Sequence, residues 1–353
     1  MSPLAALLAQ RIRDSGPIPV EEFMAQALGH PQYGYYRTRD PLGAAGDFIT
    51  APEISQMFGE LIGLWCAVVW QSLGEPRRIL LAEAGPGRGT LMADALRAAA
   101  QLPAFRAAIE PHLLETSPAL RACQARRLSD AAPVWHQDLD SLPADAPLLF
   151  IANEFFDALP IRQFVRRGGG WRERRVALNG EAFAFADGPA ASPEAPPAAE
   201  GEIFEHSPAA AAFAARLGRR LAAQGGAALI IDYGHGETAV GETLQAVRRH
   251  AYAPVLEAPG EADLTAHVDF AALAAAAAPA QALPLATQGR FLRRLGIELR
   301  AERLARARPE QADSIQRACQ RLIDAAEMGT LFKVLALTSP SLPLPPGFAP
   351  DDA

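Results

Sequence analysis

The segment Ile79 to Thr90, ILLAEAGPGRGT, most constrains the fold of this 353-residue chain, because an apolar run leads directly into an acid and three glycines. The run Ile79 to Ala82 predicts a central parallel strand, since a strand buried on both faces is continuously apolar. Gly85, Gly87 and Gly89 allow a sharp turn and a close approach of the backbone to a ligand. A helix is expected directly after them. The segment therefore predicts a nucleotide-like ligand at the carboxyl end of this strand.

The spacing of the glycines narrows the class of ligand. A dinucleotide-binding turn of the form G-x-G-x-x-G would need a glycine at position 90, where this chain has Thr90. NAD and FAD are therefore the weaker interpretation. Glu83 precedes the first glycine and completes an E-x-G-x-G-x-G pattern. This pattern resembles motif I of the class I S-adenosylmethionine (SAM) methyltransferases, and the resemblance implies that Glu83 faces the amino-acid end of SAM.

Two further acids follow expected strands. The run HLLET brings Glu115 to the place where a Rossmann-like fold puts the carboxylate that accepts both ribose hydroxyl groups. Asp138 follows the segment Val134 to Gln137, where an acid or amide commonly meets the adenine amino group in this fold. In the alternative interpretation, the glycines only make a tight connection and Glu115 only begins a helix.

Composition excludes several classes of protein. A hydrophobic content of 50% with 21% charged residues is ordinary for a soluble globular chain. The net charge of −7 argues against a broad nucleic-acid or anionic-membrane surface. The uncharged run from Leu61 to Gly74 is too short to cross a bilayer. Lys333 is the only lysine, so no Walker A or kinase lysine can be assigned.

The cysteines and the amino terminus indicate the cellular compartment in which the protein is expected. Cys66, Cys123 and Cys319 are far apart and form no C-x-x-C pair, so neither a disulfide framework nor a metal site is expected. Arg11 and Arg13 interrupt the apolar amino terminus, which leaves no h-region for a secretory signal. We therefore expect a cytoplasmic protein.

Alternating strand and helix patterns predict one α/β domain over residues 76–338. Seven strands are expected, which is the count of the class I SAM methyltransferase sheet, and this resemblance implies a Rossmann-like sheet with an antiparallel last strand. An insertion at about 161–226 contains a hairpin, signalled by Asn179-Gly180, and a helix. Residues 1–75 are expected to form a helical extension packing on this domain, and 339–353 a flexible proline-rich tail. The expected strands are Ile79 to Ala84, Leu113 to Thr116, Pro133 to His136, Leu148 to Asn153, Ala227 to Tyr233, a run near Leu283 to Gln288, and Leu331 to Thr338.

Ligands of open α/β sheets lie at the carboxyl ends of the strands, so the residues after the fourth strand are candidates for chemistry. Amino methyltransferases often place an Asn or Asp, two prolines and an aromatic there; this chain keeps Asn153 and Phe156 but lacks the prolines. Glu154 replaces the first proline with a carboxylate, which suits a guanidinium. Asn153, Glu154 and Asp157 are therefore candidate catalytic residues for methyl transfer to arginine. The alternative is that Glu154 and Asp157 only cap a helix.

Seven segments carry a resemblance to a known family: GPIPVEEFMAQALGHPQYGYY, GDFITAPEISQMFGELIGLW, AEAGPGRGTLMADALR, NEFFDALPIRQFV, IIDYGH, GEADLTAHVDF and MGTLFKVLAL. Together they resemble the MidA-type SAM-dependent methyltransferases over about Gly16 to Leu337. The mitochondrial members of that family are complex I assembly factors that methylate an arginine of the quinone-site subunit. The resemblance implies the class I fold, SAM as cofactor with S-adenosyl-homocysteine as product, and a protein arginine as substrate.

Two of these segments lie outside the expected sheet and add site candidates. Asp47 and Thr50 in GDFIT precede a helix and could hydrogen-bond the amino or carboxylate end of SAM. His267 in GEADLTAHVDF follows the fifth strand, where arginine methyltransferases carry a histidine-bearing loop. It is a candidate for orienting a carboxylate or relaying a proton, although a lone histidine is more often structural.

Three functions remain open from the sequence. The first is a protein-arginine methyltransferase, whose partner is a protein that contains the target arginine. The second is a noncatalytic SAM-binding assembly chaperone, and the third is a small-molecule N- or O-methyltransferase, because a fold alone does not fix the substrate. No nucleic-acid partner and no membrane insertion are expected, and the oligomeric state is left open.

Overall fold

The structure is a computed structural model that describes residues 2–38 and 50–349 of the chain. Contacts between Cα atoms divide the chain into two compact units. The first comprises Met1–Phe48, Phe156–Ala212 and His235–Ala272, and the second comprises Ile49–Phe155, Phe213–Gly234 and Leu273–Ala353. None of the helices in the described ranges is long and apolar enough to cross a membrane.

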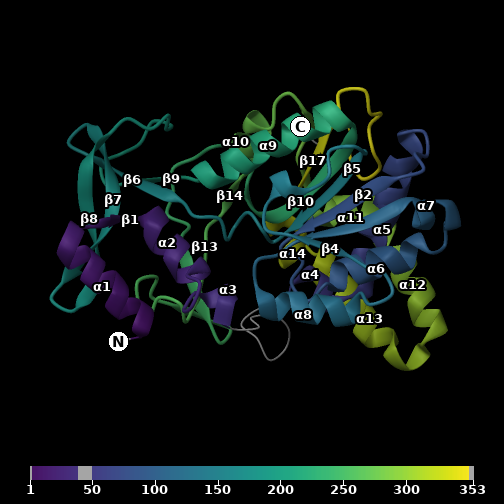
Figure 1. Ribbon diagram of the computed structural model, residues 1–353, viewed down its shortest axis with the longest axis horizontal. Helices are drawn as coiled ribbons and strands as arrows, with labels where there is room; N and C mark the ends of the chain where they lie inside the picture. The colour runs from purple at the N-terminus through teal and green to yellow at the C-terminus, as the bar shows by residue number, and fades with distance from the viewer. Residues whose placement is uncertain (1, 39–49, 350–353) are drawn as a thin grey trace. The chain divides into compact units, whose positions relative to one another are not determined.

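The second unit is built around the predicted sheet (Figure 1). Its strands follow the order β15-β17-β10-β5-β2-β3-β4. The strands from β10 to β4 run parallel to one another, and β17 runs antiparallel to β10, as the resemblance to class I methyltransferases implies. The bounds are β2 (Ile79–Ala84), β3 (Ile109–Leu114), β4 (Val134–His136), β5 (Leu148–Asn153), β10 (Gly226–His235), β15 (Gln281–Ala282), β16 (Ala286–Thr287) and β17 (Phe332–Thr338). The predicted α/β fold with a mostly parallel sheet is confirmed.

The sheet edge beside β17 differs in detail from the expected sixth strand. Instead of one run near Leu283 to Gln288, two short strands, β15 and β16, each pair antiparallel with β17. Between them, Leu283 N still donates to Ala336 O at 2.9 Å. The interruption follows from Pro284, which has no N–H group to donate to the ladder.

Helix α5 packs closely on α6 because glycines line its contact face. A Cβ on Gly63 would lie 2.6 Å from Ala95 O, and a Cβ on Gly59 would lie 2.6 Å from Asp94 Cβ. Both helices contribute to the hydrophobic core of the second unit, so α5 belongs by its contacts to the unit that holds the sheet. The helices between residues 51 and 276 have the bounds α4 (Ala51–Ile54), α5 (Gln56–Ser72), α6 (Thr90–Ala99), α7 (Pro103–Ala108), α8 (Pro118–Arg127), α9 (Pro208–Gln224) and α10 (Phe270–Ala276).

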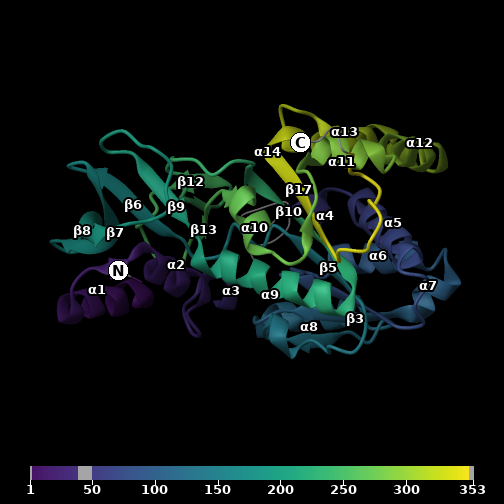
Figure 2. The ribbon, with the colours of Figure 1, turned by 90° about the horizontal axis from the view of Figure 1, so that it is seen from above.

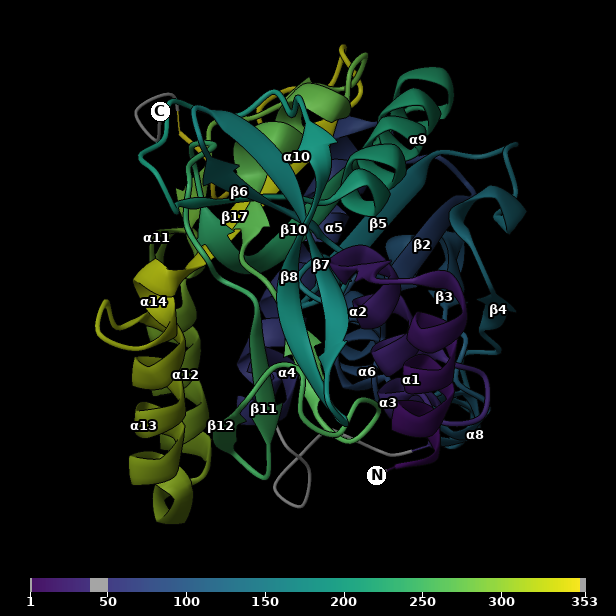
Figure 3. The same cartoon turned by 90° about the vertical axis from the view of Figure 1, so that its left-hand side faces the viewer.

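Four helices precede and adjoin β17 and lie together in two views (Figures 2 and 3). They are α11 (Gln288–Arg294), α12 (Ile297–Ala307), α13 (Ala312–Ile323) and α14 (Met328–Leu331). The described part of the tail packs on this region, in contrast to the flexible tail expected from the sequence. Phe348 is buried with its ring centroid 5.4 Å from that of Phe291, and Trp65 Nε1 donates to Pro346 O at 3.1 Å. Apolar side chains among the prolines account for the difference, because they join the core.

The first unit holds two small sheets and its own core. One sheet has the order β1-β7-β6-β9, with β8 paired to β7, and the other has the order β12-β11-β13. Helices α1 and α2 contact β7 (Figure 3). The predicted hairpin is present, with Asn179 opposite Ala182 and Gly180 at a φ of 62°. The bounds are α1 (Pro3–Ser15), β1 (Ile18–Pro19), α2 (Val20–Gly29), α3 (Tyr35–Thr38), β6 (Arg162–Arg167), β7 (Gly170–Asn179), β8 (Ala182–Ala191), β9 (Ile203–His206), β11 (Gln245–Arg248), β12 (Ala251–Ala253), β13 (Asp263–Thr265) and β14 (Val268–Asp269).

Candidate functional site

The glycine turn follows β2 and leads into α6. Gly85, Gly87 and Gly89 have φ values of 61°, 53° and 76°, which L side chains rarely adopt. A Cβ on Gly85 would lie 3.1 Å from Cδ2 of Phe155. Gly89 is the N-cap of α6 and its N–H donates to Pro86 O at 2.7 Å. The turn therefore requires its glycines and leaves backbone groups at the start of a helix, where a ligand can approach.

Glu83 lies near the end of β2 as a buried carboxylate with an unused acceptor. Its residue is 3% exposed, and its Oε2 has no hydrogen-bond partner among the described residues. Burial raises the pKa of this carboxyl group to about 8. A cationic ammonium group supplies what such a carboxylate lacks, a charged donor. The orphaned oxygen thus fits the amino group of SAM.

Glu115 follows β3 as predicted and is held in one orientation. Its Oε1 accepts from Ser117 N at 2.7 Å, and its Oε2 accepts from Gln124 Nε2 at 3.1 Å. Burial raises the pKa of this carboxyl group. Each oxygen keeps a further acceptor position. The carboxylate is therefore fixed and still able to receive ribose hydroxyl groups.

Asp138 makes a local contact that the sequence analysis did not anticipate. Its side chain accepts from Ser141 N at 2.9 Å and so caps the short 3₁₀ helix Leu139–Ser141. The residue is exposed and follows β4. One carboxylate oxygen thus has a structural role, and the contact with adenine stays a prediction.

Asn153 and Glu154 lie together at the carboxyl end of β5. Glu154 Oε1 accepts from Asn153 Nδ2 at 3.0 Å and from Ala51 N, the first residue of α4, at 3.1 Å. Glu154 therefore does cap a helix, although α4 is distant in the sequence. Its φ of 51° is costly for any residue other than glycine. Asn153 is buried, and its Oδ1 has no hydrogen-bond partner within residues 2–38 and 50–349.

Asp232, at the carboxyl side of β10, is a site residue that the sequence analysis missed. It is fully buried, and its two carboxylate oxygens accept from Tyr233 N at 3.0 Å and from Phe155 N at 3.2 Å. It thereby holds the segment that follows Asn153 and Glu154. The signal was present in the sequence, because an acid ends the apolar run of IIDYGH.

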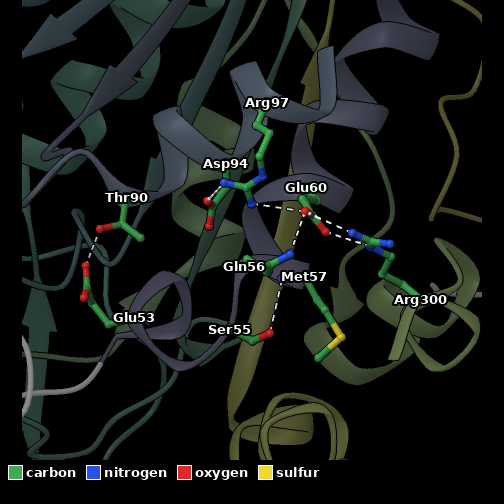
Figure 4. Close-up of polar contacts among 9 residues, drawn as sticks. All are labelled: Glu53, Ser55, Gln56, Met57, Glu60, Thr90, Asp94, Arg97 and Arg300. Atoms are coloured by element: carbon green, nitrogen blue, oxygen red, sulfur yellow. Dashed lines mark hydrogen bonds and ion pairs between the residues drawn. The ribbon is translucent and has the colours of Figure 1, made fainter. Parts of the chain in front are cut away.

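The segment before α5 contributes Thr50 and Glu53. Thr50 is the N-cap residue of α4, but its side chain makes no capping hydrogen bond. Glu53 instead accepts a hydrogen bond from the hydroxyl group of Thr90, the first residue of α6 (Figure 4). This contact ties α4 to the helix of the glycine turn. Asp47 lies outside the described residues.

Asp157 and His267 both belong to the first unit, whereas Asn153 and Glu154 belong to the second. Within the first unit, Ala266 N donates to Asp157 O at 3.0 Å, which brings the segment that carries His267 beside Asp157. His267 N donates to Thr243 Oγ1 at 2.8 Å. No catalytic role of Asp157 or His267 follows from these backbone contacts.

A second acid of the first unit faces a tyrosine. Tyr36 Oη donates to Asp263 Oδ1 at 2.8 Å. Burial, together with the charges of Asp263 and Asp157, raises the pKa of Tyr36 well above its ordinary value. The first unit therefore has two buried carboxylates close to one phenol.

The sheet order, the glycine turn after β2 and the fixed acid after β3 define the class as a class I SAM-dependent methyltransferase. The chain belongs to the family described as "Putative S-adenosyl-L-methionine-dependent methyltransferase", whose model matches residues 61–287. SAM is accordingly the cofactor. The glycines, Glu83 and Glu115 are the residues whose geometry fits it, and their contacts with SAM stay predictions.

Curated relatives and a solved structure agree with this family. Protein arginine methyltransferase NDUFAF7 homolog, mitochondrial, of Drosophila melanogaster is 37% identical, with 95% of this chain and 84% of that protein covered. Protein arginine methyltransferase NDUFAF7, mitochondrial, of Danio rerio is 38% identical, with 94% and 85% covered. A crystal structure from Burkholderia thailandensis, bound to S-adenosyl-homocysteine, is 31% identical with a TM-score of 0.85, covering 98% of this chain and 93% of that chain.

These relatives overturn the expected location. The curated relatives are named as mitochondrial proteins, so the prediction of a cytoplasmic protein is wrong. The physical argument behind that prediction was too narrow. It rested on the apolar pattern of the first residues, which does not distinguish among compartments.

Proposed function

We propose that this methyltransferase transfers the methyl group of SAM to a guanidinium nitrogen of a protein arginine. The observation that carries the proposal is the buried Oδ1 of Asn153, an acceptor without a partner in the described parts of the chain. It lies at the carboxyl end of β5, the edge of the sheet where ligands of such folds bind. A guanidinium N–H donor would satisfy it.

Glu154 supports this role by holding the amide of Asn153 in one orientation. Its Oε1 accepts from Asn153 Nδ2, so the amide oxygen is turned away from Glu154. The carboxylate also adds a negative charge, which suits an arginine that is charged in water. SAM supplies an electrophilic methyl group, and these side chains orient the attacking nitrogen and favour the loss of its proton.

We further propose that Asp157 recognises the target guanidinium and that His267 orients a carboxylate or relays a proton. Asp157 is a buried carboxylate, and the first unit places a second one, Asp263, within reach of Tyr36. Acids of this kind attract a cationic guanidinium better than a neutral hydroxyl group or an anionic nucleic acid. We assign Thr50 and Asp47 to the amino-acid end of SAM, and Asp138 to its adenine.

Relatives support arginine as the acceptor, because several are named protein arginine methyltransferases and cover most of this chain. The resemblance to MidA-type enzymes extends the proposal to a subunit of complex I as the protein that carries the arginine. We also propose that the protein binds no nucleic acid. The proposal does not depend on the oligomeric state.

The decisive test combines product analysis with one substitution. Purified protein is incubated with methyl-labelled SAM and fractionated lysate proteins, and labelled residues are identified by mass spectrometry. We expect methylarginine in a protein fraction. Asn153→Ala should lower the rate of labelling by roughly 100-fold while the Kd for S-adenosyl-homocysteine stays near that of the wild type.

Asn179→Ala, in the exposed hairpin turn of the first unit, is the matched control and should label normally. A label found on a small metabolite, with no methylarginine in any protein fraction, would reject the proposed substrate. Wild-type labelling by Asn153→Ala would reject the role of Asn153. A large loss of affinity for S-adenosyl-homocysteine in that variant would show that Asn153 binds the cofactor instead of the arginine.

A further inference from the structure

We propose that Gln124 is a positioning residue of the SAM site, which sets the ribose-binding carboxylate of Glu115 against the glycine turn. The proposal rests on the proposed role of Glu115, whose carboxylate accepts hydrogen bonds from the ribose hydroxyl groups of SAM. It does not depend on the identity of the methyl acceptor. Gln124 lies on α8, outside every motif that the sequence pattern singled out. It touches the cofactor site through its neighbours, so it is not a catalytic residue.

The hydrogen bonds of Gln124 join three parts of the second unit. Its Nε2 donates to Gly87 O at 2.7 Å and to Glu115 Oε2 at 3.1 Å. Its Oε1 accepts from Trp135 Nε1 at 2.8 Å, and Trp135 lies on β4. One side chain therefore connects the glycine turn, the carboxylate of Glu115 and the edge strand β4.

The chemistry of these three partners selects an amide. Gly87 O and the carboxylate of Glu115 can only accept, and the indole N–H of Trp135 can only donate. Only a side chain with two N–H donors and one acceptor, in this geometry, satisfies all three. Glutamine has this set, whereas glutamate lacks the donors, and methionine has no donor and only a weak acceptor. The orientation of the amide is thereby fixed by its surroundings.

The burial of Gln124 makes the loss of any of these hydrogen bonds costly. Gln124 has 0% exposure, so water cannot replace a lost partner. Glu115 Oε1 is held by Ser117 N, and Gln124 holds the other oxygen. With both oxygens held, the carboxylate plane is fixed before a ligand arrives, and its remaining lone pairs have a defined direction. Loss of the Gln124 bond would free the carboxylate to rotate.

This role predicts a loss that depends on the ribose hydroxyl groups. Gln124→Met, a change of similar length, should weaken the Kd for S-adenosyl-homocysteine by about tenfold, which corresponds to roughly one hydrogen bond to a charged group. The 2′-deoxy analogue of S-adenosyl-homocysteine cannot use the full bidentate contact. Its Kd should change by less than about threefold, measured for both ligands by isothermal titration calorimetry.

A double-mutant cycle with Glu115→Ala separates positioning from general damage. Once the carboxylate is absent, adding Gln124→Met should change the Kd for S-adenosyl-homocysteine by less than about twofold. Gln288→Met is the matched control, because Gln288 is equally buried in the same unit and donates to Leu322 O at 2.9 Å, away from the glycine turn. It should leave the Kd unchanged.

Gln124→Glu provides a second variant of the same shape in case Gln124→Met does not fold. It places a carboxylate next to that of Glu115, so its affinity for S-adenosyl-homocysteine should fall at neutral pH and recover as the pH is lowered. Equal losses for both ligands, additive effects in the cycle, or a pH-independent loss in Gln124→Glu would each overturn the proposal and assign Gln124 a merely structural role.

Discussion

At the scale of single residues, the site consists of buried polar groups whose neighbours leave part of their hydrogen-bonding capacity unused. Glu83 Oε2 and Asn153 Oδ1 have no partner within the described ranges, whereas both oxygens of Glu115 are held. A buried polar atom without a partner destabilises the ligand-free fold. At this edge of the sheet a bound ligand can supply the missing donors, which agrees with the proposed SAM beside Glu83 and the proposed arginine beside Asn153.

Glu83 gives a pH prediction. Its pKa of about 8 lies above the value of about 4.3 for an unfolded chain, so the folded state binds this proton more tightly. The stability that this adds is present below the unfolded pKa and is lost as the pH rises through about 8. We expect Glu83→Gln to gain stability relative to the wild type between pH 5 and 8, measured by urea unfolding of the ligand-free proteins. A constant difference across this range would show that Glu83 is ionised throughout.

At the scale of elements, an acid on α5 ties three helices of the second unit together. Glu60 is 7% exposed and accepts from Arg97 on α6 at 3.0 Å and from Arg300 on α12 at 2.8 Å (Figure 4). Gln56 Nε2 donates to the same carboxylate at 3.0 Å. Although burial acts to raise it, hydrogen bonds from Arg300 and Arg97 hold the pKa of Glu60 below its ordinary value.

Removing this carboxylate should loosen the helices around the sheet. Glu60→Ala leaves two arginines facing each other without their shared anion, so we expect a loss of about 2 to 3 kcal/mol in the free energy of unfolding. This loss of unfolding free energy is smaller than the loss on removing one partner of a fully buried ion pair, because both arginines reach solvent. Glu302→Ala, which removes the exposed ion pair with Arg306, should cost less than about 1 kcal/mol in the same denaturation assay. Equal effects of the two variants would contradict this assignment.

At the scale of the whole molecule, the described end of the chain completes the core of the second unit. Phe348 is buried among core side chains and lies against Phe291, and a Cβ on Gly347 would lie only 2.4 Å from that ring. Leu344, a few residues earlier, is 49% exposed. The segment therefore alternates between buried and exposed apolar residues, although its prolines prevent regular secondary structure.

Phe348→Ala tests whether this contact contributes to stability. Removal of a buried aromatic ring should lower the free energy of unfolding by about 2 to 4 kcal/mol, because the cavity it leaves cannot close fully. Leu344→Ala is the matched control and should change it by less than about 0.5 kcal/mol. Thermal unfolding monitored by circular dichroism distinguishes the two. If Phe348→Ala unfolds like the wild type, the tail is as loosely held as its composition predicts.

Local patterns in the sequence determined the sheet and predicted where the cofactor binds. Continuous apolar runs predicted the buried strands, and glycines that need a positive φ fixed the turn after β2, because both properties depend on neighbouring residues. The position of Glu115 followed in the same way, from its place directly after a strand. These features are therefore readable without knowing what the rest of the chain does.

Tertiary structure alone decided which side chains meet. Nothing in the order of residues indicates that Gln124 on α8 reaches both Gly87 and Glu115, or that Glu154 caps α4, about a hundred residues earlier. The burial of Phe348 within a proline-rich end likewise depends on a surface that distant helices form. Periodicity and turn chemistry act over a few residues, whereas hydrogen-bond partners and packing are chosen in three dimensions, where sequence separation carries no information.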